Sequence, residues 1–123
     1  MAILDDLKQH LINNGITTPI YFNFLPADSA NLVLLWNYDG TSKELGRNAR
    51  VQFCAKHLDM QEAEKLCEQI YDTVYPKEQF KKVITVNNKP MHIKPIQTPF
   101  YNGKDESNRH SYIFNCNIDY ERT

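Results

Sequence analysis

The segment from Val51 to Val74 constrains this chain most, because two different hydrophobic periods follow one another within it. Val51, Phe53 and Ala55 alternate with residues of the opposite face, which is the period of a half-buried strand. Asp59 then stands at a helix N-cap position, and Glu62 three residues later completes a capping-box-like start. The residues that recur at helical spacing are Met60, Ala63, Leu66, Cys67, Ile70, Tyr71 and Val74. The segment predicts a strand followed directly by an amphipathic helix.

Length, charge and hydropathy set the bounds for the rest of the chain. Its 123 residues predict a single domain, residues 1–123, with one core. The formal net charge of −1 argues against a nucleic-acid binder, which normally has a basic excess, so we expect no sequence-specific nucleic-acid partner. No apolar run approaches the ~20 residues of a membrane span, so we expect no membrane partner either. Three cysteines make a disulfide framework improbable and predict folding in a reducing compartment.

The N-terminal third of the chain predicts one helix and two strands. Residues 3–11 place four aliphatic side chains on one helical face, and Gly15 is the expected stop signal. Residues 20–24 form a short aromatic-rich strand pattern. Residues 31–38 form a strongly apolar run, which predicts a central strand that is buried on both faces. A loop is expected between Asp39 and the strand that contains Val51.

The residues after the second helix predict further strands. Residues 83–86 and 90–96 flank an Asn-Asn pair, which indicates a hairpin. Pro90 and Pro95 should confine its second arm to a sheet edge, because proline cannot donate to a ladder. Residues 97–109 are predicted to be a polar loop, and residues 112–120 alternate as a clear final strand.

Together these elements predict an α+β fold with the order α-β-β-β-α-β-β-β. The runs of strands between the helices favour a mostly antiparallel sheet with two main helices packed on one face.

The candidate metal and catalytic residues are weak. Cys54 and His57 have a Cys-x-x-His spacing, but they point to opposite faces of a strand and no second close pair follows. We therefore interpret the cysteines as small buried hydrophobes, and we expect no metal ion, cofactor or catalytic residue. The four histidines carry no local nucleophile–base signature.

Two further features of the sequence indicate no binding or catalytic site. The four glycines form no phosphate-binding loop. The paired acids at 5–6 and 105–106 are interpreted as solvated charges.

The charge distribution is more informative. Residues 59–72 contain five acids and one lysine, whereas residues 77–94 contain five lysines and one glutamate. One interpretation is a solvated helix face beside edge lysines that discourage aggregation. The other is that the two patches meet between subunits in a head-to-tail contact, which can close into a ring. The candidate contact residues are Glu64, Glu68, Asp72, Lys77, Lys81, Lys82 and Lys89.

The segment 97–109 also has two interpretations. It can be an ordinary mobile loop, or it can project toward a partner. Phe100, Tyr101 and Arg109 favour the second, because aromatic residues and arginine are enriched at protein interfaces.

With these elements, the chain resembles one known family: the minor capsid and tail-terminator proteins of long-tailed phages. The resemblance covers most of the chain in three parts. The first is a helix that ends near Asn14-Gly15. The second is a strand and helix with Arg50 to Lys56, Asp59, Ala63-Glu64, Leu66 and Ile70-Tyr71-Asp72. The third is a final strand after Arg109 that contains Tyr112, Phe114 and Asn115.

The resemblance implies an α+β subunit that assembles into a ring, usually of six copies, which caps the tail tube and joins it to the head. Its implied partners are further copies of itself, the tail-tube protein and the head connector proteins. It implies a place in the virion at the tail or head–tail junction, after synthesis in the host bacterial cytoplasm, and it brings no enzymatic residues.

Two alternatives to a tail terminator remain open at this point. One is a head-completion or connector protein of the same virion. The other is a small host enzyme or regulatory binding domain, which a deep pocket with converging histidine and cysteine side chains would favour.

Overall fold

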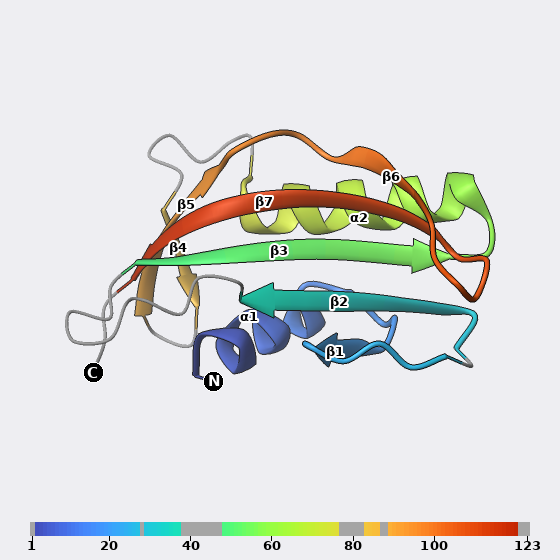
Figure 1. The fold of residues 1–123 in the computed structure, drawn as a ribbon. Coiled ribbons are helices and arrows are strands. Elements are labelled where there is room, and N and C mark those ends of the chain that lie inside the picture. Colours follow the sequence, from blue (N-terminus) through green and yellow to red (C-terminus); the bar gives the residue numbers. More distant parts are fainter. Residues whose placement is uncertain (1, 28, 38–47, 77–82, 87–88, 121–123) are drawn as a thin grey trace.

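The computed structural model describes residues 2–27, 29–37, 48–76, 83–86 and 89–120. Over these ranges the chain forms one mostly antiparallel sheet with two helices on one face (Figure 1), which confirms the predicted α+β fold. Within them, no helix is long and apolar enough to cross a membrane. The predicted loop that begins at Asp39 and the predicted Asn-Asn turn lie outside the described residues.

The elements follow the predicted order, with one strand more than expected. They are α1 (Ala2–Asn13), β1 (Ile20–Phe22), β2 (Asn31–Asn37), β3 (Asn48–His57), α2 (Met60–Val74), β4 (Val83–Val86), β5 (Lys89–Pro95), β6 (Phe100–Lys104) and β7 (His110–Tyr120).

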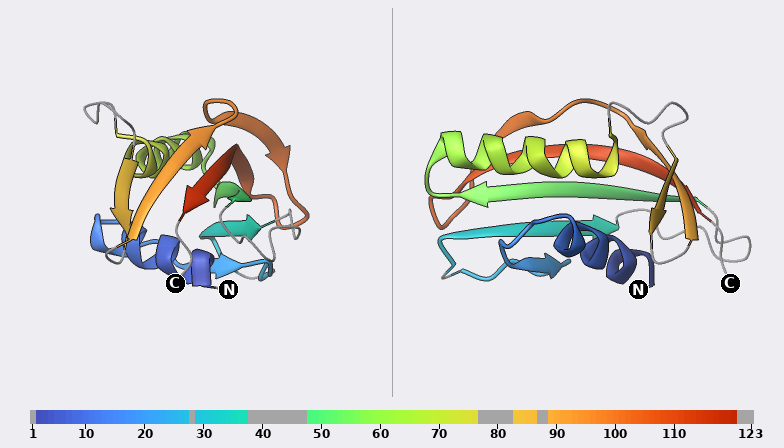
Figure 2. Two further views of the ribbon diagram at one scale, coloured as in Figure 1. Left: turned by 90° about the vertical axis from the view of Figure 1, so that its left-hand side faces the viewer. Right: turned by 180° about the vertical axis from the view of Figure 1, so that it is seen from behind.

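The last strand of the chain is the centre of the sheet. The strand order is β1-β2-β3-β7-β5-β4, with β6 beside β7. β7 pairs with β3 along its whole length, with β5 over its C-terminal half and with β6 over its N-terminal half. Among the described strands only β1 and β2 run parallel. Both helices lie behind the sheet in Figure 1, and they come to the front when the molecule is seen from behind in Figure 2.

The helix-covered face of the sheet carries the main core. Phe53 of β3 and Phe114 of β7 are paired residues whose rings stack with centroids 4.8 Å apart, and Tyr71 of α2 meets Phe114 edge-on at 5.1 Å. Ile70 of α2 and Leu7 of α1 belong to the same buried cluster. Both helices therefore pack on one face of a sheet that includes β3 and β7, as predicted.

The predicted start of α2 is confirmed with one change of partner. The Asp59 side chain accepts hydrogen bonds from the backbone N–H groups of Gln61 (2.9 Å) and Glu62 (3.4 Å). The backbone N–H of Asp59 donates to Nδ1 of His57 at 2.9 Å, so His57, not Glu62, makes the reciprocal half of the cap. Met60 was expected on the apolar stripe, but it is 45% exposed because it lies in the first turn, beyond the sheet.

The expectation that β5 is an edge strand was wrong, because β5 lies between β7 and β4. The prolines are tolerated because each lies where only one neighbouring strand is paired. Pro90 pairs with Thr85 of β4, and the pairing with β7 begins only at Met91. Pro95 pairs with Cys116 of β7, beyond the last pair with β4. A missing N–H therefore interrupts no two-sided ladder.

The interpretation of residues 97–109 as a loop was also wrong over Phe100–Lys104, which is strand β6. Its pairing with β7 is irregular between Tyr101 and Lys104, and Gly103 there has a φ of +88°. A bulge with a left-handed glycine breaks the alternation of side chains, so the strand has no clear sequence period.

The opposite face of the sheet, called here the outer face, has a much smaller apolar cluster. It consists of Leu32, Leu34, Cys54 and Ile113, with Tyr21 packed against it. The interpretation of the three cysteines as buried hydrophobes is confirmed. Burial raises the pKa of the Cys116 thiol to about 12, so it stays protonated at neutral pH.

Candidate assembly surface

The outward face of α2 carries a row of acidic side chains. Glu64, Glu68 and Asp72 are all exposed, as their helical spacing predicted. Glu62 pairs with Lys65 at 3.6 Å, whereas no ion pair to the other three acids is found among the described residues. Within the described part of the chain, the row therefore presents negative charge to solvent without a basic partner.

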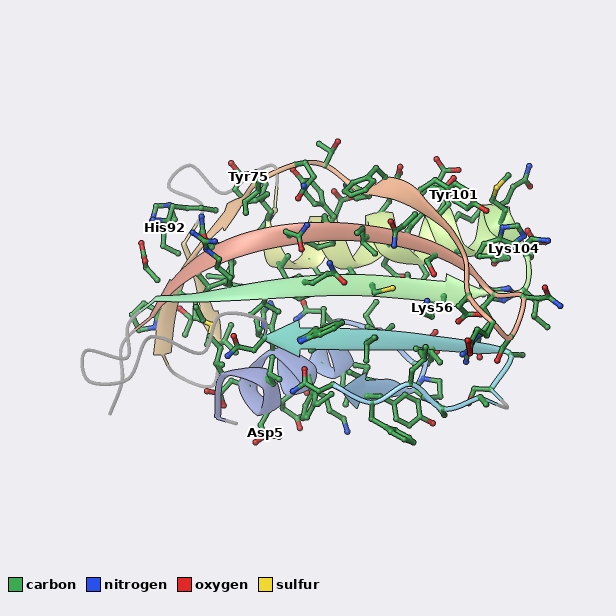
Figure 3. The ribbon with its side chains drawn as sticks, in the orientation of Figure 1. Asp5, Lys56, Tyr75, His92, Tyr101 and Lys104 are labelled. Atoms are coloured by element: carbon green, nitrogen blue, oxygen red, sulfur yellow. The ribbon has the colours of Figure 1, made fainter. Side chains whose placement is uncertain are left out.

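Strand β6 carries two exposed aromatic side chains on opposite faces of the sheet. Tyr101 lies on the helix side, whereas Phe100 pairs with Ile113 of the small apolar cluster and lies on the outer face. Phe100 is 39% exposed and Tyr101 is 43% exposed. The rings of Tyr101 and Tyr112 lie 5.4 Å apart, and the Tyr101 hydroxyl shares a hydrogen bond of 2.9 Å with Nδ1 of His110. Tyr101 and Tyr112 are paired residues, so both side chains lie on the helix side of the sheet. Figure 3 labels Tyr101 on β6.

The acidic row and the aromatic pair belong to one surface. Desolvation raises the pKa of Tyr112, and the negative charges of Glu64 and Glu68 raise it further. Residues predicted separately, from a helix and from a supposed loop, thus come together in the fold. We call Glu64, Glu68, Tyr101 and Tyr112 the acidic–aromatic face. This surface is suited to binding another macromolecule, because it combines aromatic area with exposed negative charge.

A buried cluster of charges lies at the end of the outer face where β3 and β6 terminate. Oδ2 of Asp105 lies 3.3 Å from Nζ of Lys56 and 2.9 Å from Nε of Arg109. Nζ of Lys56 also lies 2.6 Å from Oγ of Ser111. The Arg109 side chain is only 1% exposed. Lys56, Asp105, Arg109 and Ser111 are called the ion cluster below; Figure 3 labels Lys56 on β3.

The ion cluster fastens the loop between β1 and β2 to the loop between β6 and β7. Nη1 of Arg109 donates to the carbonyl of Ser29 (3.2 Å), and the Ser107 hydroxyl donates to the carbonyl of Ala27 (2.8 Å). Oδ1 of Asp105 accepts from the backbone N–H groups of Ser107 (2.9 Å) and Arg109 (3.0 Å). Burial raises the pKa of Asp105, but these hydrogen bonds and the charges of Lys56 and Arg109 outweigh it, so the net pKa is lowered.

Two sequence-based interpretations of charged residues were wrong, and the sequence did not predict the ion cluster as a whole. Asp105 is no solvated charge, and Asp6 of the other predicted acidic pair is only 9% exposed. Arg109 was a candidate contact residue, but its burial gives it a role inside the subunit, and we do not propose it as a contact. The available signal was the Asp-x-x-x-Arg spacing around Ser107-Asn108, which is typical of an Asx turn.

The basic half of the predicted charge pattern is mostly beyond what the structure describes. Lys77, Lys81 and Lys82 lie outside the described residues, and the side chain of Lys89 is not described. Lys94 is described; it lies 2.6 Å from Asp119 and is about half exposed. The predicted contact through the other lysines stays a prediction.

The predicted metal and catalytic candidates are placed as follows. His57 and His110 are paired residues of β3 and β7, but Nδ1 of His57 binds the N–H of Asp59 and Nδ1 of His110 binds Tyr101. Cys54 lies in the small apolar cluster. Within the described ranges, no three histidine, cysteine or acidic residues are grouped to hold a metal ion.

These features define a class of protein: a small α+β subunit with exposed acidic and aromatic side chains, which are suited to contacts with other subunits. A family model described as bacteriophage tail terminator protein matches residues 10–122. The chain therefore belongs to the bacteriophage tail terminator family and is a structural protein of phage virion assembly. Among curated proteins, none matches it.

Proposed function

We propose that this protein is a tail terminator that forms a ring at the head–tail junction, where it caps the tail tube and joins it to the head. The family match over residues 10–122 is the observation that carries this proposal. Its partners would be further copies of itself, six to a ring, the tail-tube protein and the head connector proteins. It would act without catalysis as a single domain, after synthesis in the host bacterial cytoplasm.

The acidic–aromatic face supports a subunit contact. In a head-to-tail ring, each copy offers one surface and receives a different one. The acidic row of α2 would meet the basic segment 77–94 of the next copy. Exposed charge pairs contribute only ~0–1 kcal/mol each, so they would orient subunits more than hold them. The free protein would therefore be monomeric and form the ring on the end of the tail tube.

Particles assembled without this protein test the assignment. The terminator function predicts filled heads beside overlong, unattached tails in electron micrographs, and normal particles when the wild-type chain is supplied in trans. Tails of normal length joined to heads in its absence would contradict it. Empty or leaking heads would instead favour the second candidate, a head connector of the same virion.

The electrostatic part of the proposal has its own test. Reversing Lys77, Lys81, Lys82 and Lys89 to glutamate should reduce the number of joined particles and leave the fold intact, as judged by circular dichroism. The reduction should depend on salt, because exposed charges are screened within ~10 Å at 0.1 M salt. Full joining by the reversed protein at all salt concentrations would remove the charge contact and leave the assignment standing.

A further inference from the structure

A groove lies between α1 and the edge strand β1. It has a volume of about 560 Å³ and is lined by residues 16–21 together with Lys8 and Ile12 of α1. Ile12 is 45% exposed, and Nζ of Lys8 lies 5.6 Å from the centre of the Phe22 ring. The groove is thus mainly apolar, with one cation at its wall. Figure 2 shows α1 and β1 along the same lower edge of the molecule.

Among the described strands, β1 pairs with β2 alone, so no described strand covers its other edge. The carbonyl of Pro19 accepts from the N–H of Val33, and the N–H of Asn23 donates to the carbonyl of Leu35, so the odd-numbered residues point toward β2. Because successive backbone groups alternate in direction along a strand, those of Ile20 and Phe22 point away from β2. An unpaired strand edge is a template for another strand.

Strand β6 forms the other edge at the same level of the sheet. Ile20 pairs with Val33 and Val33 with Ala55, while Ala55 pairs with Tyr112 and Tyr112 with Tyr101. This row crosses the five strands β1-β2-β3-β7-β6 from edge to edge. Among the described strands β6 pairs with β7 alone, so its outer edge is open.

The two edges are complementary. At the β6 edge, the Tyr101 ring lies on the helix side, 5.4 Å from the ring of its pair partner Tyr112. Desolvation raises the pKa of Tyr112, and the negative charges of Glu64 and Glu68 act on it and raise it further. At the β1 edge, the helix side has the apolar groove and Lys8. A tyrosine fits an apolar groove with polar surroundings. Lys8 carries the charge opposite to that of Glu64 and Glu68, and would share these acids with the basic segment 77–94 of its own copy.

We propose that strand β6 of one copy docks in the α1–β1 groove of the next copy, so that the sheet continues from subunit to subunit. The docking rests on the proposed ring function and specifies its contact. β1 runs parallel to β2, β2 antiparallel to β3, β3 to β7 and β7 to β6, so β6 is antiparallel to β1 within one copy. Copies arranged around an axis along the strands would keep these directions and join through antiparallel pairing.

Thiol cross-linking tests this contact. Thr17 in the groove and Asn102 on β6 are exposed, and the native cysteines are buried. A T17C/N102C chain is supplied to a phage that lacks the wild-type protein, and the particles that join are purified. A short thiol-specific cross-linker should then convert the chain in purified particles into a ladder of multimers.

The single variants are the matched controls. T17C alone and N102C alone should give no multimer, whereas a mixture of the two should give dimers and nothing larger, because each contact uses one residue of each kind. Dimers from N102C alone would indicate a two-fold contact and overturn the proposal.

Joined particles that contain the doubly substituted chain, with both thiols accessible to a maleimide dye but no multimer after cross-linking, would overturn the docking and leave the terminator function intact. Heads and tails that join normally without any copy of the chain would overturn both.

If the doubly substituted chain fails to fold, a charge-swap experiment with the variants K8E and E64K/E68K takes the place of the cross-linking. Each alone should reduce joining, and their combination should restore part of it, because only the contact with Lys8 is exchanged; equal loss in the combination would contradict the docking.

Discussion

The two faces of the sheet are stabilised in different ways. The helix-covered face is a single large apolar cluster in which Phe53, Phe114 and Ile70 are fully buried. The outer face has four buried apolar residues and relies on directed contacts, among them the ion cluster and a hydrogen bond of 3.2 Å between Gln52 and Asn115. Apolar packing tolerates shifts of position, whereas ion pairs and hydrogen bonds require specific geometry. The difference suggests that the helices secure the fold and the outer face fixes the loops.

The largest effect is expected on the helix-covered face. Ile70→Asp would place a charge at a fully buried position, which costs several kcal/mol, comparable with the ~5–15 kcal/mol stability of a whole domain. We expect an unfolded or insoluble protein, measured by soluble yield and Tm. Gln69→Asp, at an exposed neighbouring position, is the control and should change stability by less than ~0.5 kcal/mol. A soluble Ile70→Asp protein with unchanged Tm would show that α2 does not bury this face.

The ion cluster should give the next largest effect. Asp105→Asn leaves the buried charges of Lys56 and Arg109 without their carboxylate, and breaking such a pair costs about 3–5 kcal/mol. Urea unfolding measures the change. Glu106→Gln, at an exposed position, should be close to neutral. Equal stability of the two variants would mean that the outer face, like the helix-covered face, depends mainly on apolar packing.

Acid should remove the same contribution. The pKa of Asp105 is lowered in the folded protein, so its stabilisation is complete above the unfolded-state pKa of ~3.9 and is lost as the pH falls through the lower folded-state value. The stability difference between wild type and Asp105→Asn should therefore be constant near neutral pH and shrink below about pH 4. A difference that shrinks between pH 7 and 5 would assign the effect to another group.

The N-cap of α2 is a directed contact at the end of the helix-covered face. Asp59→Ala removes the acceptor for two backbone N–H groups and should cost about 1 kcal/mol. Asp59→Asn keeps an acceptor and should cost much less. Chemical denaturation of the two variants side by side measures this, and equal losses would show that the charge of Asp59 matters more than its hydrogen bonds.

The smallest effect is expected for the exposed ion pair on the outer face. Lys94 and Asp119 lie 2.6 Å apart but are each more than 40% exposed, so Lys94→Met should cost no more than ~1 kcal/mol. High salt should reduce the cost further. A loss as large as that of Asp105→Asn would show that exposure does not distinguish this ion pair from the buried ion cluster.

The sequence predicted the helix-covered face well, because that face depends on periodicity. Ile3, Leu7 and Leu11 repeat at helical spacing, and the alternation of residues 112–120 assigns one side of β7 to the core. These patterns arise from geometry that is local to each element. The position of Asp59 before α2 was readable for the same reason.

The outer face and the candidate surface were less predictable, because they depend on contacts between distant segments. Arg109 and Ser29 are 80 residues apart, and no local pattern pairs them. β6 was missed because its bulge disturbs the alternation, so Tyr101 was recognised by residue type and not by position. The identity of the acidic row was predicted from α2 alone, but its closeness to Tyr101 and Tyr112 required the fold.

The central place of β7 has a consequence for synthesis on the ribosome. Without β7 the described strands form only separate pieces, β1-β2-β3 and β4-β5, with β6 unpaired. Residues 110–120 must therefore leave the ribosome before the sheet can close and cover its apolar face. Such long-range pairing slows folding and leaves the growing chain exposed to aggregation or chaperone capture. The timing of translation thus sets the earliest moment at which a copy is competent for assembly.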